Sequence, residues 1–185
     1  MTNTRKLAYI AILSAVSFLL LYFSFPLIPA ADFLKVDFSI LPVLIALVIF
    51  DFKSAIGVLL LRSLLKLLLN NGGLGSMIGL PMNFVALGVF VWGLSYFWKK
   101  NQTSKNYIFG SVVGTVLLTV AMVVLNYIYA VPLYAKFANF DIAQFIGLYK
   151  YLFAIVVPFN LLEGLIFSVA FALIYAPLKS ILVKL

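Results

Sequence analysis

Long apolar runs with few charges limit what this chain can fold into. Six such segments occur, and most of the lysines and arginines lie in the short stretches between them. Of the 185 residues, 65% are hydrophobic and only 10% are charged. A soluble domain of this size cannot bury so much apolar surface, whereas a bilayer accepts helices of about 20 apolar residues. The chain is therefore predicted to be an all-α integral membrane protein.

The six segments are expected to form one membrane domain over residues 1–185. The predicted helices cover 7–28, 38–50, 54–69, 78–98, 107–131 and 147–177. The second and third would rise only about 20 Å and about 24 Å, against a hydrocarbon core of about 30 Å. They either cross where protein shields them or form a re-entrant hairpin, and the charged turn between them favours two crossings. The first segment lacks a small-residue cleavage signature and is interpreted as a retained helix.

The basic residues predict an orientation, because cytoplasmic loops are enriched in lysine and arginine. One side carries Arg5, Lys6, Lys53, Lys99, Lys100, Lys105, Lys179 and Lys184, while the other carries Lys35, Lys136 and Lys150, with Lys66 close to it. Both termini are therefore expected in the cytoplasm, with 29–37, 70–77 and 132–146 outside. Contact with anionic lipid headgroups accounts for the net charge of +8, and nucleic acid is not expected as a partner.

Polar residues inside the apolar segments are the first candidates for a binding site. Asn83, Asn126 and Asn160 lie within predicted spans, where an unpaired amide is costly because hydrocarbon offers no partner. Glu163 follows Asn160 on the same helix face, together with Phe153, and Pro158 predicts a kink. Such a helix suits a ligand with a flat ring and polar edges. The alternative is that these side chains only join helices by hydrogen bonds.

Two basic residues, Arg62 and Lys66, lie inside the third segment. A charge at the centre of a membrane costs at least about 2.5–3.5 kcal/mol on insertion scales. Lys66 is near the end of its segment and can extend to the interface. Arg62 lies deeper, and Glu163 is the acidic residue well inside a later segment. The sequence therefore predicts a pair between Arg62 and Glu163.

The first segment and the loop after it carry two further features. Ala11 and Ala15, together with Ala8, form a stripe of small residues on one helix face. Such stripes let helices approach closely in lipid, so this one either packs within the protein or docks another subunit. The loop from Ala30 to Asp37 mixes charged and apolar residues. It is expected to act as a lid over a ligand, with a solvated connector as the alternative.

Motifs of catalysis are missing from the sequence. The chain has no cysteine and no histidine, which excludes thiol redox chemistry, disulfides and the usual metal sites. It lacks the glycine-rich phosphate loop, so it is not expected to use ATP itself. Its five carboxylates are scattered along the chain. We therefore expect no enzyme, no catalytic residue, no metal and no cofactor.

A series of motifs extends over nearly the whole chain in a specific order. They are 25–29 (FPLIP), 33–42 (FLKVDFSILP), 78–86 (IGLPMNFVA), Asn126 with 132–134 (PLY), and 158–160 (PFN). In this order and spacing the chain resembles the riboflavin-specific S components of energy-coupling factor (ECF) transporters. These are membrane subunits that bind a vitamin and act only within a larger complex.

The resemblance implies a six-helix subunit of the bacterial plasma membrane that captures riboflavin from the outer face. It also implies partners, namely a transmembrane coupling subunit (EcfT) and two ATPase subunits. By position, the three asparagines are expected to contact riboflavin through their amides, and Leu41 and Phe153 to cover the ring faces. Ala11 and Ala15 match the family's docking surface for the coupling subunit. Glu163 departs from the family, where a basic or amide side chain is expected, so pairing with Arg62 competes with a ligand contact.

Two other functions are compatible with the residues themselves. One is an S component for a different vitamin, which the colour and fluorescence of flavin would distinguish. The other is a small non-transport membrane protein, such as a channel or an assembly factor, in which the interior asparagines are structural. Co-purification with ATPase subunits would separate these classes.

Overall fold

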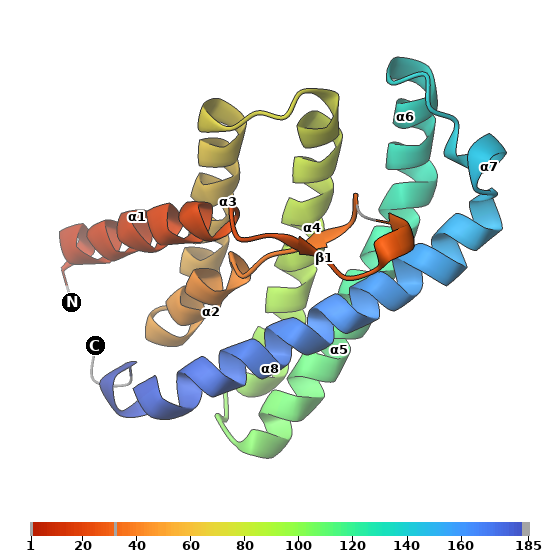
Figure 1. Ribbon diagram of the computed structural model, residues 1–185. Coiled ribbons are helices and arrows are strands. Elements are labelled where there is room, and N and C mark those ends of the chain that lie inside the picture. Colours follow the sequence, from red (N-terminus) through yellow and green to blue (C-terminus); the bar gives the residue numbers. More distant parts are fainter. Residues whose placement is uncertain (1, 32, 183–185) are drawn as a thin grey trace.

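The computed structural model describes residues 2–31 and 33–182 and is almost entirely helical. Its main helices are α1 (Asn3–Leu20), α2 (Ile40–Ile49), α3 (Phe52–Leu69), α4 (Leu74–Trp98), α5 (Ser104–Leu125), α6 (Val131–Phe137), α7 (Ile142–Phe145) and α8 (Val157–Leu182). Figure 1 shows the α3–α4 connection and the α6–α7 region at one end of the molecule, with the α4–α5 connection at the other. The beginning of α1 lies on the same side as the end of α8.

Three helical stretches in the described part of the chain are long and apolar enough to cross a membrane. They are Leu74–Trp98, Ser104–Phe137 and Lys150–Ser180. The second joins α5 to α6 through η2 (Asn126–Ala130), and the third joins η3 (Lys150–Val156) to α8. Both η2 and η3 are π-helical. A π-helix places more residues in each turn than an α-helix, and such turns are frequent at functional sites.

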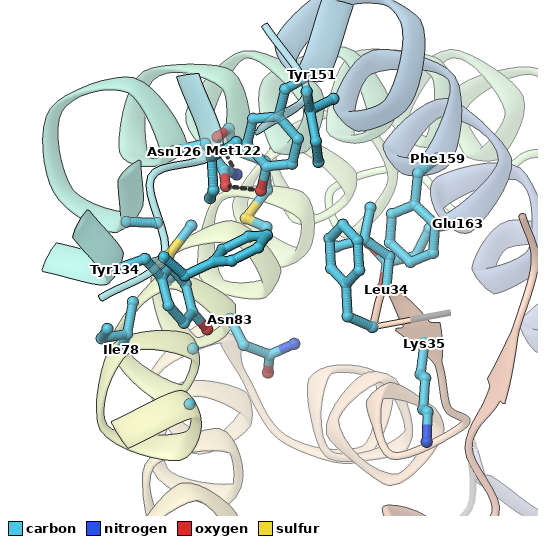
Figure 2. A pocket seen from close by; sticks show the side chains of 18 residues that line it. Leu34, Lys35, Ile78, Asn83, Met122, Asn126, Tyr134, Tyr151, Phe159 and Glu163 are labelled. Carbon is cyan, nitrogen blue, oxygen red and sulfur yellow. Dashed lines mark hydrogen bonds between the residues drawn. The ribbon is translucent and has the colours of Figure 1, made fainter. Parts of the chain in front are cut away.

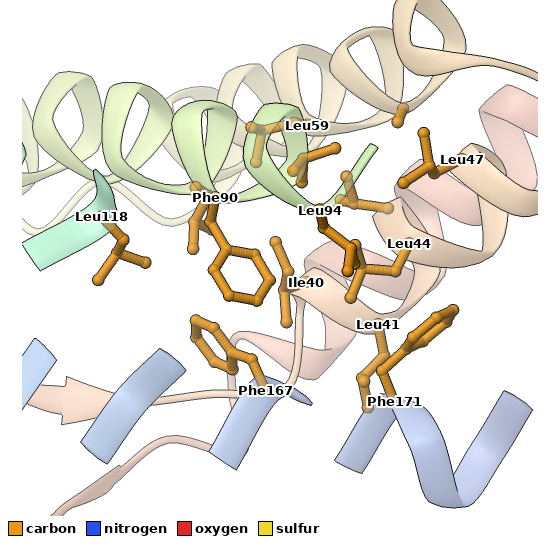
Figure 3. Close-up of a cluster of buried hydrophobic side chains, with 14 of the residues drawn as sticks. Ile40, Leu41, Leu44, Leu47, Leu59, Phe90, Leu94, Leu118, Phe167 and Phe171 are labelled. Carbon is orange, nitrogen blue, oxygen red and sulfur yellow. The ribbon is translucent and has the colours of Figure 1, made fainter. Parts of the chain in front are cut away.

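Helix α2 forms the centre of the hydrophobic core. Eight of its ten residues are buried, because the other helices surround it. Figure 3 shows its side chains between Leu59 of α3, Phe90 of α4 and Phe171 of α8. Lys99 closes the end of α2, since its ammonium group donates to the carbonyl oxygens of Leu47 and Val48 at 2.7 and 2.8 Å. The shortest of the six predicted helices is therefore enclosed by protein and does not need to meet lipid.

Glycines allow α4, α5 and α8 to approach closely. A Cβ atom added to Gly93 of α4 would lie 2.9 Å from the Cα atom of Gly114 on α5. A Cβ atom on Gly114 would lie 2.8 Å from the carbonyl oxygen of Phe90. On α8, a Cβ atom on Gly164 would lie 2.5 Å from the hydroxyl oxygen of Thr115. Small residues of this kind let helix backbones touch in a membrane.

The first helix differs from the expected span of 7–28. Helix α1 begins at Asn3 and ends at Leu20. The chain then forms strand β1 (Phe25–Pro26), which pairs antiparallel with strand β2 (Lys35–Val36). A short 3₁₀ helix, η1 (Pro29–Ala31), lies between the strands. Proline disfavours helical geometry in the residue before it, so Pro26 holds Phe25 in an extended conformation.

The other helix boundaries lie closer to the sequence prediction. Helix α4 begins four residues before the expected 78–98, and α2 and α3 fit within or near 38–50 and 54–69. The fifth helical stretch continues beyond the expected 107–131, as far as Phe137. Pro158 is the second residue of α8, two residues after the end of η3, and its missing N–H removes one backbone hydrogen bond. The expected irregularity at this proline therefore occurs as a π-helical segment before it.

A charged pair joins α1 to the turn between α2 and α3. The Lys6 ammonium lies 2.8 Å from the Asp51 carboxylate, which also accepts hydrogen bonds from the backbone N–H and the hydroxyl of Ser54. The hydrogen bond from Lys6 is the main cause that lowers the pKa of Asp51 from 3.8 to about 2, against the opposing effect of burial. Asp51 thereby caps the first turn of α3.

This pair predicts a loss of stability in acid. Because the pKa of Asp51 is lowered in the folded protein, its carboxylate stabilises the fold above pH 3.8, and this contribution is lost as the pH falls toward about 2. Asp51→Asn keeps a good helix cap but removes the charge, so its unfolding midpoint in detergent should fall less in this range. Lys6→Met should cost less than about 1 kcal/mol, because the pair is exposed. Equal pH slopes for wild type and Asp51→Asn would contradict this assignment.

Candidate functional site

A cavity of about 450 Å³ lies between the β1–β2 loop, α4, the α5–α6 stretch and the beginning of α8 (Figure 2). Its lining is mostly apolar and aromatic, with a few polar side chains. The lining residues are Phe33, Leu34, Lys35, Gly75, Ile78, Gly79, Met82, Asn83, Met122, Asn126, Ala130, Tyr134, Phe140, Ile142, Ile146, Tyr151, Phe159 and Glu163. Sites for small organic ligands have this composition and volumes of about 300–1,000 Å³.

Three connecting regions that the charge pattern assigns to one side of the membrane contribute to this cavity. The loop after β1 provides Phe33 and Leu34, the beginning of α4 provides Gly75, and the α6–α7 region provides Tyr134 and Phe140. These regions are far apart in the sequence. The cavity therefore lies toward one end of the helices, beneath the loop that was expected to form a lid.

Asn126 is fixed by two hydrogen bonds at the wall of the cavity. Its amide nitrogen donates to the carbonyl oxygen of Met122 at 2.8 Å, and its amide oxygen accepts from the Tyr151 hydroxyl at 2.6 Å (Figure 2). Asn126 begins η2, and Tyr151 lies in η3. The two π-helical segments thus bring an amide and a phenol together. The Tyr151 hydroxyl still has free lone pairs with which to accept a hydrogen bond.

Asn83 and Glu163 line the same cavity from α4 and α8. The guanidinium of Arg62 donates to the Asn83 amide oxygen at 2.7 Å. The expected ion pair between Arg62 and Glu163 was wrong, because within the described residues Arg62 forms its hydrogen bond with Asn83 instead. Glu163 is 8% exposed and remains available at the cavity wall.

Comparison with known proteins decides the family. Residues 5–175 match the family model of the ECF transporter, substrate-specific component. The chain belongs to this family. The resemblance found in the sequence is thereby confirmed.

Relatives of this substrate-specific component carry consistent names. This chain is 97% identical over 185 residues to the riboflavin transporter RibU of Streptococcus thermophilus, and the match covers all of this chain and 88% of that protein. It is 44% identical to the RibU of Leuconostoc mesenteroides, over 91% of this chain and 88% of that one. A solved structure of the S component of a bacterial ECF transporter matches with a TM-score of 0.80 at 29% identity, covering 98% of this chain and 99% of the other. The chain is accordingly a multi-pass protein of the cell membrane.

The cavity of this S component brings together three of the six predicted ligand-contacting residues. Asn83, Asn126 and Glu163 line it, whereas Asn160, Leu41 and Phe153 are not among the lining residues. Asn160 is fully buried, and its amide nitrogen donates to the Val156 carbonyl at 2.7 Å. Its amide oxygen has no hydrogen-bond partner among the described residues.

Leu41 and Phe153 lie elsewhere for different physical reasons. Leu41 belongs to α2 and packs in the hydrophobic core, near Phe171 (Figure 3). Phe153 is 53% exposed and packs against Tyr149. It lies in η3, where the π-helical turns change the face on which a residue falls relative to an α-helix. As a result, Phe159 lines the cavity together with Glu163, and Phe153 does not.

Sequence reasoning missed several cavity residues of this S component. Tyr134 and Tyr151 resemble ordinary tyrosines of a membrane interface, and no pattern separates them from Tyr127 or Tyr129. Met82 and Met122 read as general lipid-facing or core residues. A usable signal existed for Phe159, because it precedes Glu163 by four residues and therefore shares its helix face.

The alanine stripe of this S component faces outward. Ala11 and Ala15 on α1 are both exposed, and Ala8 is exposed as well. Buried contacts of α1 come from other positions, namely Ser14, Ser17 and Phe18. These alanines therefore do not pack within the described part of the bundle.

Proposed function

We propose that this chain is the riboflavin-binding subunit of its ECF transporter and captures the vitamin in the cavity beneath the β1–β2 loop. One observation carries the proposal: a cavity of about 450 Å³ with aromatic walls and a few fixed amides, in a chain 97% identical to a riboflavin transporter. A tricyclic ring gains from apolar walls, while a few polar groups orient it. The ligand is cargo, and no cofactor or catalytic residue enters the mechanism.

Each type of lining residue has a distinct role in this proposal. Tyr134, Tyr151 and Phe159 cover the faces of the isoalloxazine ring. Asn83 and Asn126 interact with its polar edge or with the ribityl hydroxyls, since amides supply both donors and acceptors. Glu163 is suited to accept hydrogen bonds from hydroxyl or imide groups. The segment with Phe33 and Leu34 is the proposed lid and covers the bound ligand.

Release to the cytoplasm depends on partners in the proposed mechanism. The S component itself lacks a phosphate loop, so energy comes from two ATPase subunits through the coupling subunit EcfT. The exposed stripe of Ala11 and Ala15 is the proposed docking surface, because small side chains permit close helix contact in lipid. The names of the relatives, which are transporters, support a role without catalysis.

The proposed topology has six crossings with both termini in the cytoplasm of a bacterial cell. The distribution of basic residues supports it, as does the position of the beginning of α1 and the end of α8 on one side (Figure 1). Helix α2 rises only about 15 Å. Its burial among the other helices supports a crossing through protein instead of lipid. The six helices then constitute a single domain over residues 1–185.

Riboflavin titration tests the proposal directly. Detergent-purified protein, stripped of bound flavin, should quench riboflavin fluorescence in a saturable way at one ligand per chain. A yellow colour before stripping is expected as well. Pantothenate or biotin in excess should not displace the flavin. A folded, colourless protein that leaves riboflavin fluorescence unchanged would overturn the assignment of the vitamin, and displacement by another vitamin would identify a different cargo.

A further inference from the structure

Arg62 is a buried cation whose hydrogen bond leads to the cavity. It lies on α3 and is only 1% exposed. One of its terminal nitrogens donates to the Asn83 amide oxygen at 2.7 Å, and its Nε atom has no partner among the described residues. Burying a guanidinium inside a membrane protein is costly, and such residues commonly serve function. The contact with Asn83 is therefore the place to look for that function.

The contact determines which way the Asn83 amide points. Arginine has only donors, so the amide atom that lies 2.7 Å from it must be the oxygen. The amide nitrogen, with its two N–H groups, is then on the other side of the same planar group. Asn83 lines the cavity, and Figure 2 shows its nitrogen and oxygen directed to different sides. In contrast, both ends of the Asn126 amide already have protein partners.

We propose that Arg62 is a positioning residue that makes Asn83 a dedicated hydrogen-bond donor of the cavity. The site then selects a ligand that presents an acceptor, a carbonyl oxygen or a ring nitrogen, to Asn83 on α4. The positive charge also polarises the amide, and hydrogen bonds that involve a charged group are stronger than neutral ones. This inference rests on the proposed riboflavin site and specifies how that site recognises a hydrogen-bond acceptor at one edge of its ligand.

Asn83→Asp is the sharpest test, because it keeps the contact with Arg62 and changes only the group that faces the cavity. The aspartate still offers an oxygen to Arg62, now as an ion pair, so the fold should be retained. It replaces the N–H groups that face the cavity with an acceptor oxygen, which repels an acceptor on the ligand. Riboflavin affinity, measured by fluorescence quenching, should fall about 10-fold to 100-fold, while the thermal unfolding midpoint without ligand stays equal or rises. Asn101→Asp, on the exposed α4–α5 connection, is the control for the change in charge.

Arg62→Met provides the second variant. It removes the guanidinium and leaves the Asn83 amide free to rotate, so riboflavin affinity should fall about 5-fold. Stability without ligand should be kept, because a buried charge is replaced by an apolar side chain of similar length. A purely structural role predicts the opposite split, with lower stability and unchanged affinity in the folded protein.

The outcomes distinguish this inference from the proposed function. Saturable riboflavin binding by the wild type together with unchanged affinity in Asn83→Asp would overturn the positioning role and leave the riboflavin assignment intact. Absence of riboflavin binding by the folded wild type would overturn the proposed function, and the inference with it. A selective loss of affinity in Asn83→Asp, at unchanged stability, would support both.

Discussion

Replacing Gly79 with phenylalanine is expected to weaken riboflavin binding at least about 100-fold, which corresponds to about 2.8 kcal/mol. Gly79 lies on α4 and lines the cavity, and a Cβ atom added to it meets nothing within 4 Å. A phenyl ring at this position therefore extends into open space instead of into a neighbouring helix. It occupies room that a tricyclic ligand needs in a cavity of about 450 Å³.

The empty Gly79→Phe protein should be as stable as the wild type, because glycine inside a helix already costs about 0.5–1 kcal/mol relative to alanine. Riboflavin titration measures the affinity, and thermal unfolding without ligand measures stability. Val85→Phe is the matched control, since Val85 lies on the same helix and is 42% exposed. Tight riboflavin binding by a folded Gly79→Phe variant would show that the ligand lies elsewhere.

Replacing Gly114 with alanine is expected to destabilise the protein by about 1–3 kcal/mol. The added Cβ atom would lie 2.8 Å from the Phe90 carbonyl oxygen, which is backbone and cannot rotate away. Helices α4 and α5 must then separate. Phe90 is fully buried and packs edge-on against Phe167 of α8, so the displacement extends to a third helix. The expected loss is read from unfolding in mixed detergent micelles, followed by tryptophan fluorescence.

Gly88→Ala on α4 is expected to stabilise the protein, in contrast to Gly114→Ala. Its Cβ atom would lie 3.9 Å from the Ile56 side chain, an ordinary van der Waals distance. Only the gain from replacing a helix-interior glycine remains, about 0.5–1 kcal/mol. Equal effects of Gly114→Ala and Gly88→Ala on the unfolding midpoint would show that the close approach of α4 and α5 does not stabilise the fold.

The part of the site that is predictable from the sequence is the part that violates a physical rule. Asn83, Asn126, Asn160 and Glu163 are costly in apolar segments, so their presence requires an explanation. Asn83, Asn126 and Glu163 line the cavity, whereas Asn160 is buried outside its lining. Leu41 and Phe153 violate no rule, since apolar residues are ordinary in a membrane segment. The expected role of Leu41 depended on the resemblance alone, and that of Phe153 depended on α-helical periodicity as well. The structure places both residues away from the cavity lining.

Helix faces beyond a π-helical segment cannot be assigned from α-helical periodicity. The helical stretch from Lys150 to Ser180 contains η3. Because a π-helical turn holds more residues than an α-helical turn, residues within or before η3 do not share the helix face that α-helical spacing assigns to them. Phe153 was therefore expected on the face of Glu163 and lies on another. The contact between Tyr151 and Asn126 was equally inaccessible, because it needs two such segments in two different helices.

The end of the first helix shows a similar limit. An apolar run up to 28 predicts a continuous span, yet the chain leaves the helix after Leu20 and forms β1. The decisive contact is the pairing of Phe25 with Val36, which lies eleven residues ahead in the sequence. Hydropathy does not distinguish an apolar helix from an apolar strand that covers a cavity. Only Pro26 and Pro29 signal the change.

The pairing of β1 with β2 has a consequence for the entropy of capture. Residues Phe25 and Val36 join the two ends of the loop, so its closure is complete before any ligand arrives. Ordering a free backbone costs about 1–2 kcal/mol per residue. When the base of the loop is already paired, part of this entropic cost of ordering the backbone is met during folding. Ligand binding then needs to immobilise only the few side chains at the tip of the loop. In the proposed site this loop is therefore a preorganised cover, and more of the free energy of ring burial remains as affinity.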